Sequence, residues 1–107
     1  MAEPTLAQVF GANATQTATE LVISKADLTG LTASANNSAE SLFAAITLKA
    51  QTNLNDTNQA NNPDQSISID TGIGSITTRN NQNYREYSLT ITLSKLDTQS
   101  AIDPNDF

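Results

Sequence analysis

The side chains that could carry chemistry in this 107-residue chain are few, because the sequence contains no histidine and no cysteine. An imidazole base, a thiolate nucleophile and the usual ligands of zinc or an iron–sulfur cluster are therefore excluded. Carboxylates remain, but no spacing sets two of them on one element beside apolar neighbours that would raise a pKa. The sequence predicts no catalytic residue, no cofactor and no enzyme.

Two motifs resemble parts of ligand-binding loops, and both are incomplete. The alternating oxygen side chains from Asn53 to Gln59 resemble a calcium loop without its turn glycine and its final bidentate glutamate. The run Gly72-Ile73-Gly74 is half of a dinucleotide fingerprint, without the third glycine and the helix that should follow it. We expect no metal, and we expect residues 53–65 to form a plain surface loop.

A pair of arginines offers a different chemistry. Arg79 and Arg85 flank an asparagine-rich turn beside Tyr84, where they could bind an anion or the carboxylate of a partner. The alternative is that they are cross-strand charges that solubilise the tip of a hairpin. The net charge of -6 and the absence of any basic run give no footprint for a phosphate backbone or an anionic membrane, so neither partner is expected.

The elements that position these residues begin with a short helix. Leu6, Val9 and Phe10 are spaced i, i+3, i+4 between Pro4, at a first helical position, and the terminator Gly11. A helix this short is not stable alone in water. Its apolar stripe must therefore dock on its own core or on a neighbouring subunit. Residues 12–18 are expected to be a linker, and residues 20–24 a short strand.

A long helix is predicted over residues 38–54, with Asn37 and Glu40 as a capping box. Leu42, Phe43 and Ile46 begin its apolar face, which should be the core. Ala44, Ala45 and Leu48 form a second face, covered either by the N-terminal helix or by another subunit.

After the loop the apolar period changes from 3.6 to 2, which predicts strands. Ile67 and Ile69 alternate with polar residues, a break follows at Gly72 and Gly74, and a loop is expected at 79–83. The residues predicted to share the apolar face of the last strand are Tyr87, Leu89, Ile91 and Leu93. The expected fold is α+β: a small antiparallel sheet of three to four strands, with residues 20–24 at one edge, packed on one long helix.

The domain organisation follows from these elements. We expect an N-terminal helix and linker (1–18), an α+β core (19–96) and an acidic C-terminal arm (97–107). The tail has no regular period but contains Ile102, Pro104 and Phe107, so it is either frayed or an extended arm whose apolar residues enter pockets on a neighbour. The start, Met1-Ala2-Glu3-Pro4, lacks the features of a signal peptide, and no span is long and apolar enough for a membrane helix.

Composition favours an interaction protein. Thr, Asn, Ser and Gln supply 44 of 107 residues while only 15% are charged, and charge depletion is typical of the buried part of protein interfaces. A polar surface with no such role remains the alternative. The residues expected to make interactions are Leu6, Val9, Phe10, Leu48, Arg79, Tyr84, Arg85, Ile102, Pro104 and Phe107.

Three stretches carry a family resemblance: LTASANNSAESLFAAITLKAQ (31–51), DQSISI (64–69), and residues 84–107 with their closing IDPNDF. They resemble small structural proteins of tailed phages of cyanobacteria and of prophage-like regions in those hosts. The resemblance implies a virion component made in the host cytoplasm and present in many symmetric copies.

The expectation is therefore a homo-oligomeric capsid cement, or decoration, subunit bound to the major capsid protein. Two alternatives stay open. One is a neck, tail or baseplate component of the virion. The other is a host-encoded soluble binding module, which would need exposed aromatic residues beside a groove, whereas Tyr87 is expected in the core.

Overall fold

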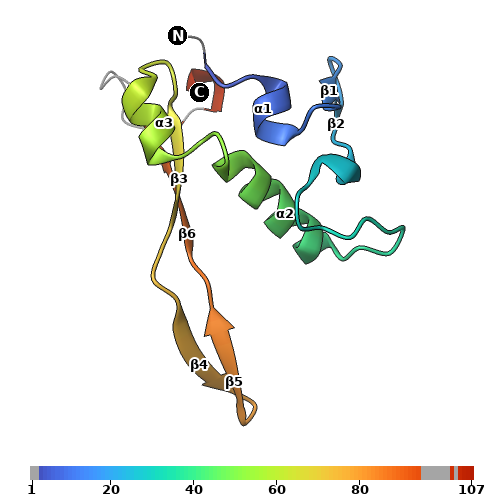
Figure 1. The fold of residues 1–107 in the computed structure, drawn as a ribbon, viewed down its shortest axis with the longest axis vertical. Coiled ribbons are helices and arrows are strands. Elements are labelled where there is room, and N and C mark those ends of the chain that lie inside the picture. Colours follow the sequence, from blue (N-terminus) through green and yellow to red (C-terminus); the bar gives the residue numbers. More distant parts are fainter. Residues whose placement is uncertain (1–2, 95–101, 103) are drawn as a thin grey trace.

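The fold is a small helical body from which a long hairpin projects (Figure 1). The computed structural model describes residues 3–94, 102 and 104–107, and its principal extents are 48 × 32 × 25 Å. The radius of gyration is 16.2 Å, against about 13 Å for a compact domain of this length. The α+β class is as predicted, and the chain is considerably more extended than a typical domain.

Helix α1 (Leu6–Phe10) opens the body. Thr5 caps it in a reciprocal arrangement, in which Thr5 Oγ1 accepts from the backbone N–H of Gln8 and Gln8 Oε1 accepts from that of Thr5. Pro4 therefore precedes the cap, where the sequence had predicted it inside the first turn. Gly11 ends the helix at a φ of +116°, and α1 packs against α2.

The next segment departs from the prediction of a linker and an edge strand. Strands β1 (Thr15–Gln16) and β2 (Leu21–Val22) pair with each other as a separate small hairpin. The hydroxyl of Thr17 accepts from the backbone N–H groups of Thr19 and Glu20 and so orders the turn between them. Strand β2 therefore pairs with β1 and is not an edge strand of the main hairpin.

The connection to the long helix contains a 3₁₀ helix (Lys25–Asp27) and the buried Leu28. Helix α2 (Ala39–Gln51) is capped by Ser38, whose hydroxyl accepts from the backbone N–H of Ser41. The predicted cap, Asn37, instead bonds to the backbone of Thr32 and Ser34 and so orders the preceding loop.

The expected loop at 53–65 contains a helix, α3 (Asp56–Asn61). Asn55 caps it by accepting from the backbone N–H of Asn58 at 2.8 Å. The expectation of a plain loop is wrong here because capping by side-chain amides stabilises a polar helix that has no apolar stripe. Gln65, just beyond it, is only 4% exposed.

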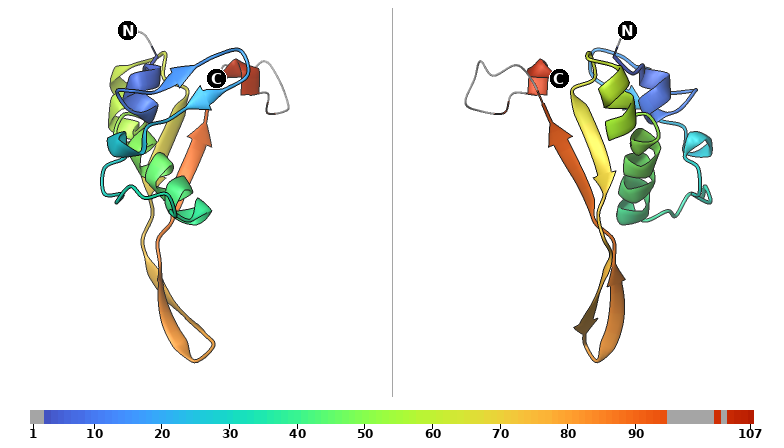
Figure 2. Two further views of the ribbon diagram at one scale, coloured as in Figure 1. Left: turned by 90° about the vertical axis from the view of Figure 1, so that its right-hand side faces the viewer. Right: turned by 60° about the vertical axis from the view of Figure 1, so that its left-hand side comes forward.

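The hairpin has an inner and an outer part (Figure 2). The inner pair is β3 (Ile67–Thr71) with β6 (Leu89–Leu93), and the outer pair is β4 (Ser75–Arg79) with β5 (Gln82–Glu86). The antiparallel hairpin and its glycine break are as predicted. The described strands form three separate two-stranded sheets, where the sequence predicted one sheet of three to four strands.

The tip of the hairpin is tighter than the loop expected at 79–83. Asn80 and Asn81 both have positive φ, 53° and 62°, as a two-residue hairpin turn requires. Asparagine tolerates this region better than most residues, so the turn closes directly on Arg79 and Gln82.

The core is small, and its residues come from the connection before α2, from α2 itself and from β3. Its buried apolar residues are Leu28, Ala45, Ala50 and Ile69. Gln51 Nε2 fastens α2 to β3 by donating to the carbonyl of Ile69 and the hydroxyl of Thr71. The predicted placement of Phe43 in the core is wrong, because its side chain is 71% exposed.

The apolar face predicted for the last strand is also only partly covered. Leu89 is half-buried, whereas Ile91 and Leu93 are exposed and Tyr87 is 78% exposed in the break before β6. Helix α2 contacts β3, which leaves much of the β6 half of this face open to solvent.

Candidate interaction site

The outer ribbon, defined as residues 75–86, is the most protruding element of the molecule (Figure 1). All its strand residues are exposed except Tyr84, which is half-buried. Residues directly opposite one another in an antiparallel pair share a face, so the register divides the ribbon into two faces.

One face is occupied by contacts within the ribbon. The carboxylate of Glu86 accepts from the hydroxyl of Thr77 at 2.7 Å and from that of Ser75 at 3.3 Å. The guanidinium carbon of Arg79 lies 4.5 Å from the ring centroid of Tyr84, within cation–π range. We call this side, formed by residues 75, 77, 79, 82, 84 and 86, the bonded face.

The opposite side, which we call the open face, consists of Ile76, Thr78, Asn83 and Arg85. Ile76 is 60% exposed and lies directly across from Arg85. The guanidinium of Arg85 makes no ion pair with the described residues, whereas Thr78 and Asn83 are hydrogen-bonded to each other. The two arginines singled out in the sequence are therefore separated, because Arg79 stacks on Tyr84 and Arg85 lies on the other face.

A second exposed surface runs along α2. Its members are spaced i, i+3, i+4, i+7 and i+8 and so share one face of the helix. We call it the α2 stripe: Glu40, Phe43, Ala44, Thr47 and Leu48. Phe43 and Leu48 are exposed, and the carboxylate of Glu40 makes no hydrogen bond or ion pair with the part of the chain that is described.

A hollow of about 220 Å³ adjoins the α2 stripe. Ala44 and Leu48 form part of its wall, and the turn at Gly30 and Leu31 forms the other side. Leu48 therefore lies beside a depression with room for an apolar side chain. The sequence predicts this small-residue face of the helix, and α1 does not fill the hollow.

The short N-terminal helix α1 packs on its own chain. The side chains of Leu6, Val9 and Phe10 are all half-buried, and α1 packs on α2. Val9 and Phe10 line a hollow of about 310 Å³ together with Phe107, which ends a short 3₁₀ turn (Pro104–Asp106). Ile102 and Pro104 are exposed, and most of the remaining tail lies outside the described residues.

A third hollow, of about 560 Å³, is lined mainly by amide side chains near α3. Its wall includes Gln65, whose Nε2 donates to the carbonyls of Asn55 and Ile67 while its buried Oε1 has no hydrogen-bond partner. Among the described residues no three acidic side chains come together as a metal site. No described helix has the length and apolar character needed to cross a bilayer.

Two residues of these surfaces, Ile76 and Phe43, take positions that the sequence does not predict. A signal for Ile76 exists, because recognising Asn80-Asn81 as a two-residue turn places Ile76 opposite Arg85. No comparable signal exists for the exposure of Phe43, since periodicity gives the face of a helix but not what covers it.

No protein-family model, curated protein or solved structure matches the chain. The chain combines a small core, a projecting ribbon and exposed apolar side chains on separate elements.

Proposed function

We propose that this chain is a non-enzymatic virion structural protein, a capsid cement subunit that stabilises the particle of a tailed phage through contacts between copies and with the major capsid protein. The resemblance of residues 31–51, 64–69 and 84–107 to small phage structural proteins supports the virion part of the proposal. The surface of the molecule supports the assembly part.

The observation that carries the proposal is an excess of surface. The accessible surface of the chain is 7917 Å², whereas a compact monomer of 11.3 kDa exposes about 5,700 Å². The difference, about 2,200 Å², is comparable to what one subunit buries in a permanent interface. A chain with this surface suits a subunit that completes its burial against neighbours.

The exposed apolar side chains are distributed over the whole molecule. They lie on β1–β2, on α2, along the hairpin and in the C-terminal segment, so no single patch contains them all. They are Leu21, Val22, Phe43, Leu48, Ile73, Ile76, Tyr87, Ile91, Leu93 and Ile102. Several contact surfaces on one small subunit suit a lattice component better than a protein with one binding partner.

The mechanical role follows from copy number. Burying apolar surface contributes about 25 cal/mol per Å², so each contact of a small subunit is modest. Repeating the contact over a symmetric shell multiplies the resistance to expansion, because neighbouring copies must separate together. Such a role requires no catalytic group.

The experiment that tests the proposal is quantification of the chain in purified particles of the phage that encodes it. A cement subunit should be present on the order of hundreds of copies per particle, and a neck or tail component at about a dozen copies per ring or fewer. Absence of the chain from intact particles would refute a structural role in the virion. A low copy number would favour the neck, tail or baseplate alternative.

The binding-module alternative needs its own test, because Tyr87 is exposed and the expectation of a core position for it is wrong. A glycan array with the purified protein distinguishes the two classes. Saturable binding to one class of glycan would favour a binding module, whereas its absence together with a high copy number in particles would support the proposal.

A further inference from the structure

We propose that the open face of the outer ribbon in one copy docks on the α2 stripe of a second copy, with Ile76 against Phe43 and Arg85 against Glu40. The inference rests on the proposed function as an assembly subunit and names the contact between copies. Both surfaces are exposed in the single chain, and each carries an apolar side chain beside a charge that has no partner among the described residues.

The two surfaces have complementary charge. Residues 75–86 contain two arginines and one glutamate, a net charge of +1, so the remainder of the chain carries -7 and the whole chain -6. Glu86 is already bonded to Ser75 and Thr77, which leaves Arg85 as the cation on the open face. The charged member of the α2 stripe is Glu40, so a second copy offers this cation one carboxylate without a partner among the described residues.

The spacing of the two pairs also matches. Ile76 and Arg85 are directly opposite in the ribbon, so their Cβ atoms are about 5 Å apart. Glu40 and Phe43 are three residues apart on a helix, which places their Cβ atoms about 5–6 Å apart. One apolar contact and one ion pair can therefore form together, and the hollow beside Leu48 adjoins the same contact.

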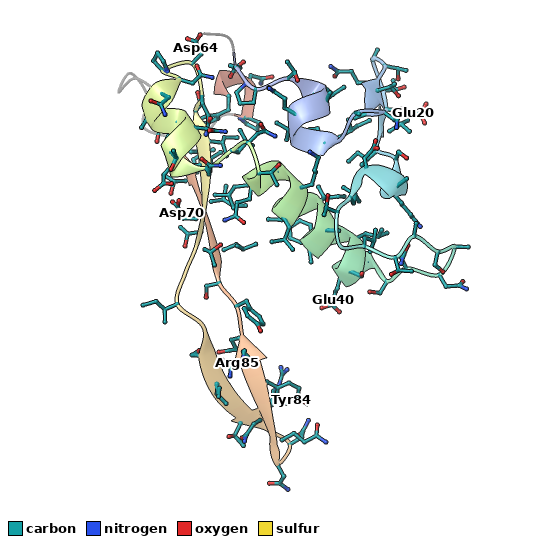
Figure 3. All side chains as sticks on the ribbon, viewed as in Figure 1. Glu20, Glu40, Asp64, Asp70, Tyr84 and Arg85 are labelled. Atoms are coloured by element: carbon teal, nitrogen blue, oxygen red, sulfur yellow. The ribbon has the colours of Figure 1, made fainter. Side chains whose placement is uncertain are left out.

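We place the contact between two copies because Arg85 and Glu40 of one copy lie on different elements and do not pair. Figure 3 shows Arg85 on the outer ribbon and Glu40 at the lower, N-terminal end of α2, so the two side chains lie on different elements. Arg85 makes no ion pair with Glu40 in the single chain, and the ribbon joins the body through the inner strands β3 and β6 (Figure 1).

Docking would also stabilise the ribbon. A two-stranded hairpin is marginally stable in water, and β4–β5 has no described helix packed on either face (Figure 2). Covering its open face with the α2 stripe of a neighbour removes Ile76 and Phe43 from water in a single contact. The exposed surface in excess of a compact monomer is large enough for such a contact on each copy.

The contact joins two different surfaces, so each copy both gives a ribbon and receives one. Two copies can exchange ribbons in a closed pair, or the contact can pass around a ring. In either arrangement the same two side-chain pairs are used, so the same substitutions test both.

The test is the mass of the purified full-length protein by light scattering across a range of concentrations. Wild-type protein should form a dimer or a defined ring. Arg85→Glu and Glu40→Arg should each weaken association by about fivefold or more, since each replaces an attraction by a repulsion. Arg79→Glu is the matched control, because it makes the same charge change on the bonded face, and it should change association much less.

Mixing the variants provides the decisive measurement. Copies with Arg85→Glu and copies with Glu40→Arg should each associate poorly alone and should associate together, because their altered surfaces are complementary. The double variant, which carries both changes, should associate as well as wild type. Circular dichroism of every variant checks that a loss of association is not a loss of fold.

Three results would overturn the inference: a wild-type protein that stays monomeric at high concentration, an Arg79→Glu effect as large as that of Arg85→Glu, or no recovery on mixing. These outcomes are distinct from failure of the proposed function. A monomer found at high copy number in particles overturns only the copy-to-copy contact, and a ring that is absent from particles overturns only the virion role.

Discussion

Asp27 accepts two hydrogen bonds from Asn13, one from its backbone N–H at 2.9 Å and one from its side-chain Nδ2 at 3.2 Å. The pair ties the chain after α1 to the 3₁₀ helix before α2. Gly11 lies against the same aspartate, where a Cβ would come within 2.5 Å of the Asp27 Cβ. This corner fixes the orientation of α1 on the body, and it is the first place where a substitution should have a clear effect.

Gly11→Ala should lower the free energy of unfolding by about 1–3 kcal/mol, because an added methyl group meets Asp27 and the residue has a φ of +116°. Gly30→Ala is the control, since Gly30 also has positive φ but nothing lies within 4 Å of the place its methyl group would take. Urea unfolding measures both. Equal losses of stability in the two variants would show that the loss comes from backbone strain alone and that the contact with Asp27 adds nothing.

Ile69→Ala should lower the free energy of unfolding by about 2–5 kcal/mol, because it opens a cavity where β3 meets α2. Phe43→Ala should change it by about 0.5 kcal/mol or less, since that side chain is mostly in water. Thermal unfolding at low protein concentration, where association is minimal, makes the comparison. A large effect of Phe43→Ala in the monomer would place it in the core.

Phe10→Asp should destabilise the subunit by about 1–3 kcal/mol, since Phe10 is half-buried and lines the hollow shared with Leu54 and Ile67. The measurement is far-UV circular dichroism during thermal unfolding, with light scattering alongside. Should the variant lose association while its melting temperature is unchanged, the stripe of α1 belongs to an interface and not to its own subunit.

Gln65→Glu should make stability depend on pH. The buried carboxylate would replace an amide that donates to two carbonyls, so burial and these acceptors should raise its pKa above the usual value of about 4.3. A raised pKa in the folded state means that the folded state binds more protons. The variant should therefore lose stability as the pH rises above about 4.3, relative to wild type.

The matched control for that experiment is Gln59→Glu, which makes the same chemical change on the less buried α3, although Gln59 also donates to the carbonyl of Gln65. Unfolding by urea at several pH values measures both variants against wild type. A flat difference between Gln65→Glu and wild type from about pH 4 to pH 8 would contradict the burial of this side chain.

The sequence predicts those elements whose pattern is local. The i, i+3, i+4 spacing of Leu6, Val9 and Phe10 suffices for α1, and the alternation at Ile67 and Ile69 suffices for β3. Helix α3 cannot be predicted in this way, because its residues are almost all polar and its stability depends on the cap at Asn55. The local pattern therefore predicts an element only when apolar residues repeat along one side of it.

The candidate site is harder to predict than the fold. Arg79, Tyr84 and Arg85 can be selected from the sequence, but their division between two faces depends on the register set by the turn. Phe43 is exposed because no other described element covers that side of α2. The sequence of the helix itself does not show which of its sides will be covered. Pairing and coverage are non-local properties, so they need the assembled chain.

The outer strands also bear on how single copies of the chain can aggregate. Neither β4 nor β5 contains a lysine or a proline, the residues that commonly protect an edge from pairing with another chain. The charged side chains of Arg79, Arg85 and Glu86 are then the residues that oppose strand addition at these two edges. Incubating concentrated protein should raise thioflavin fluorescence over time, and Thr78→Lys should suppress this rise.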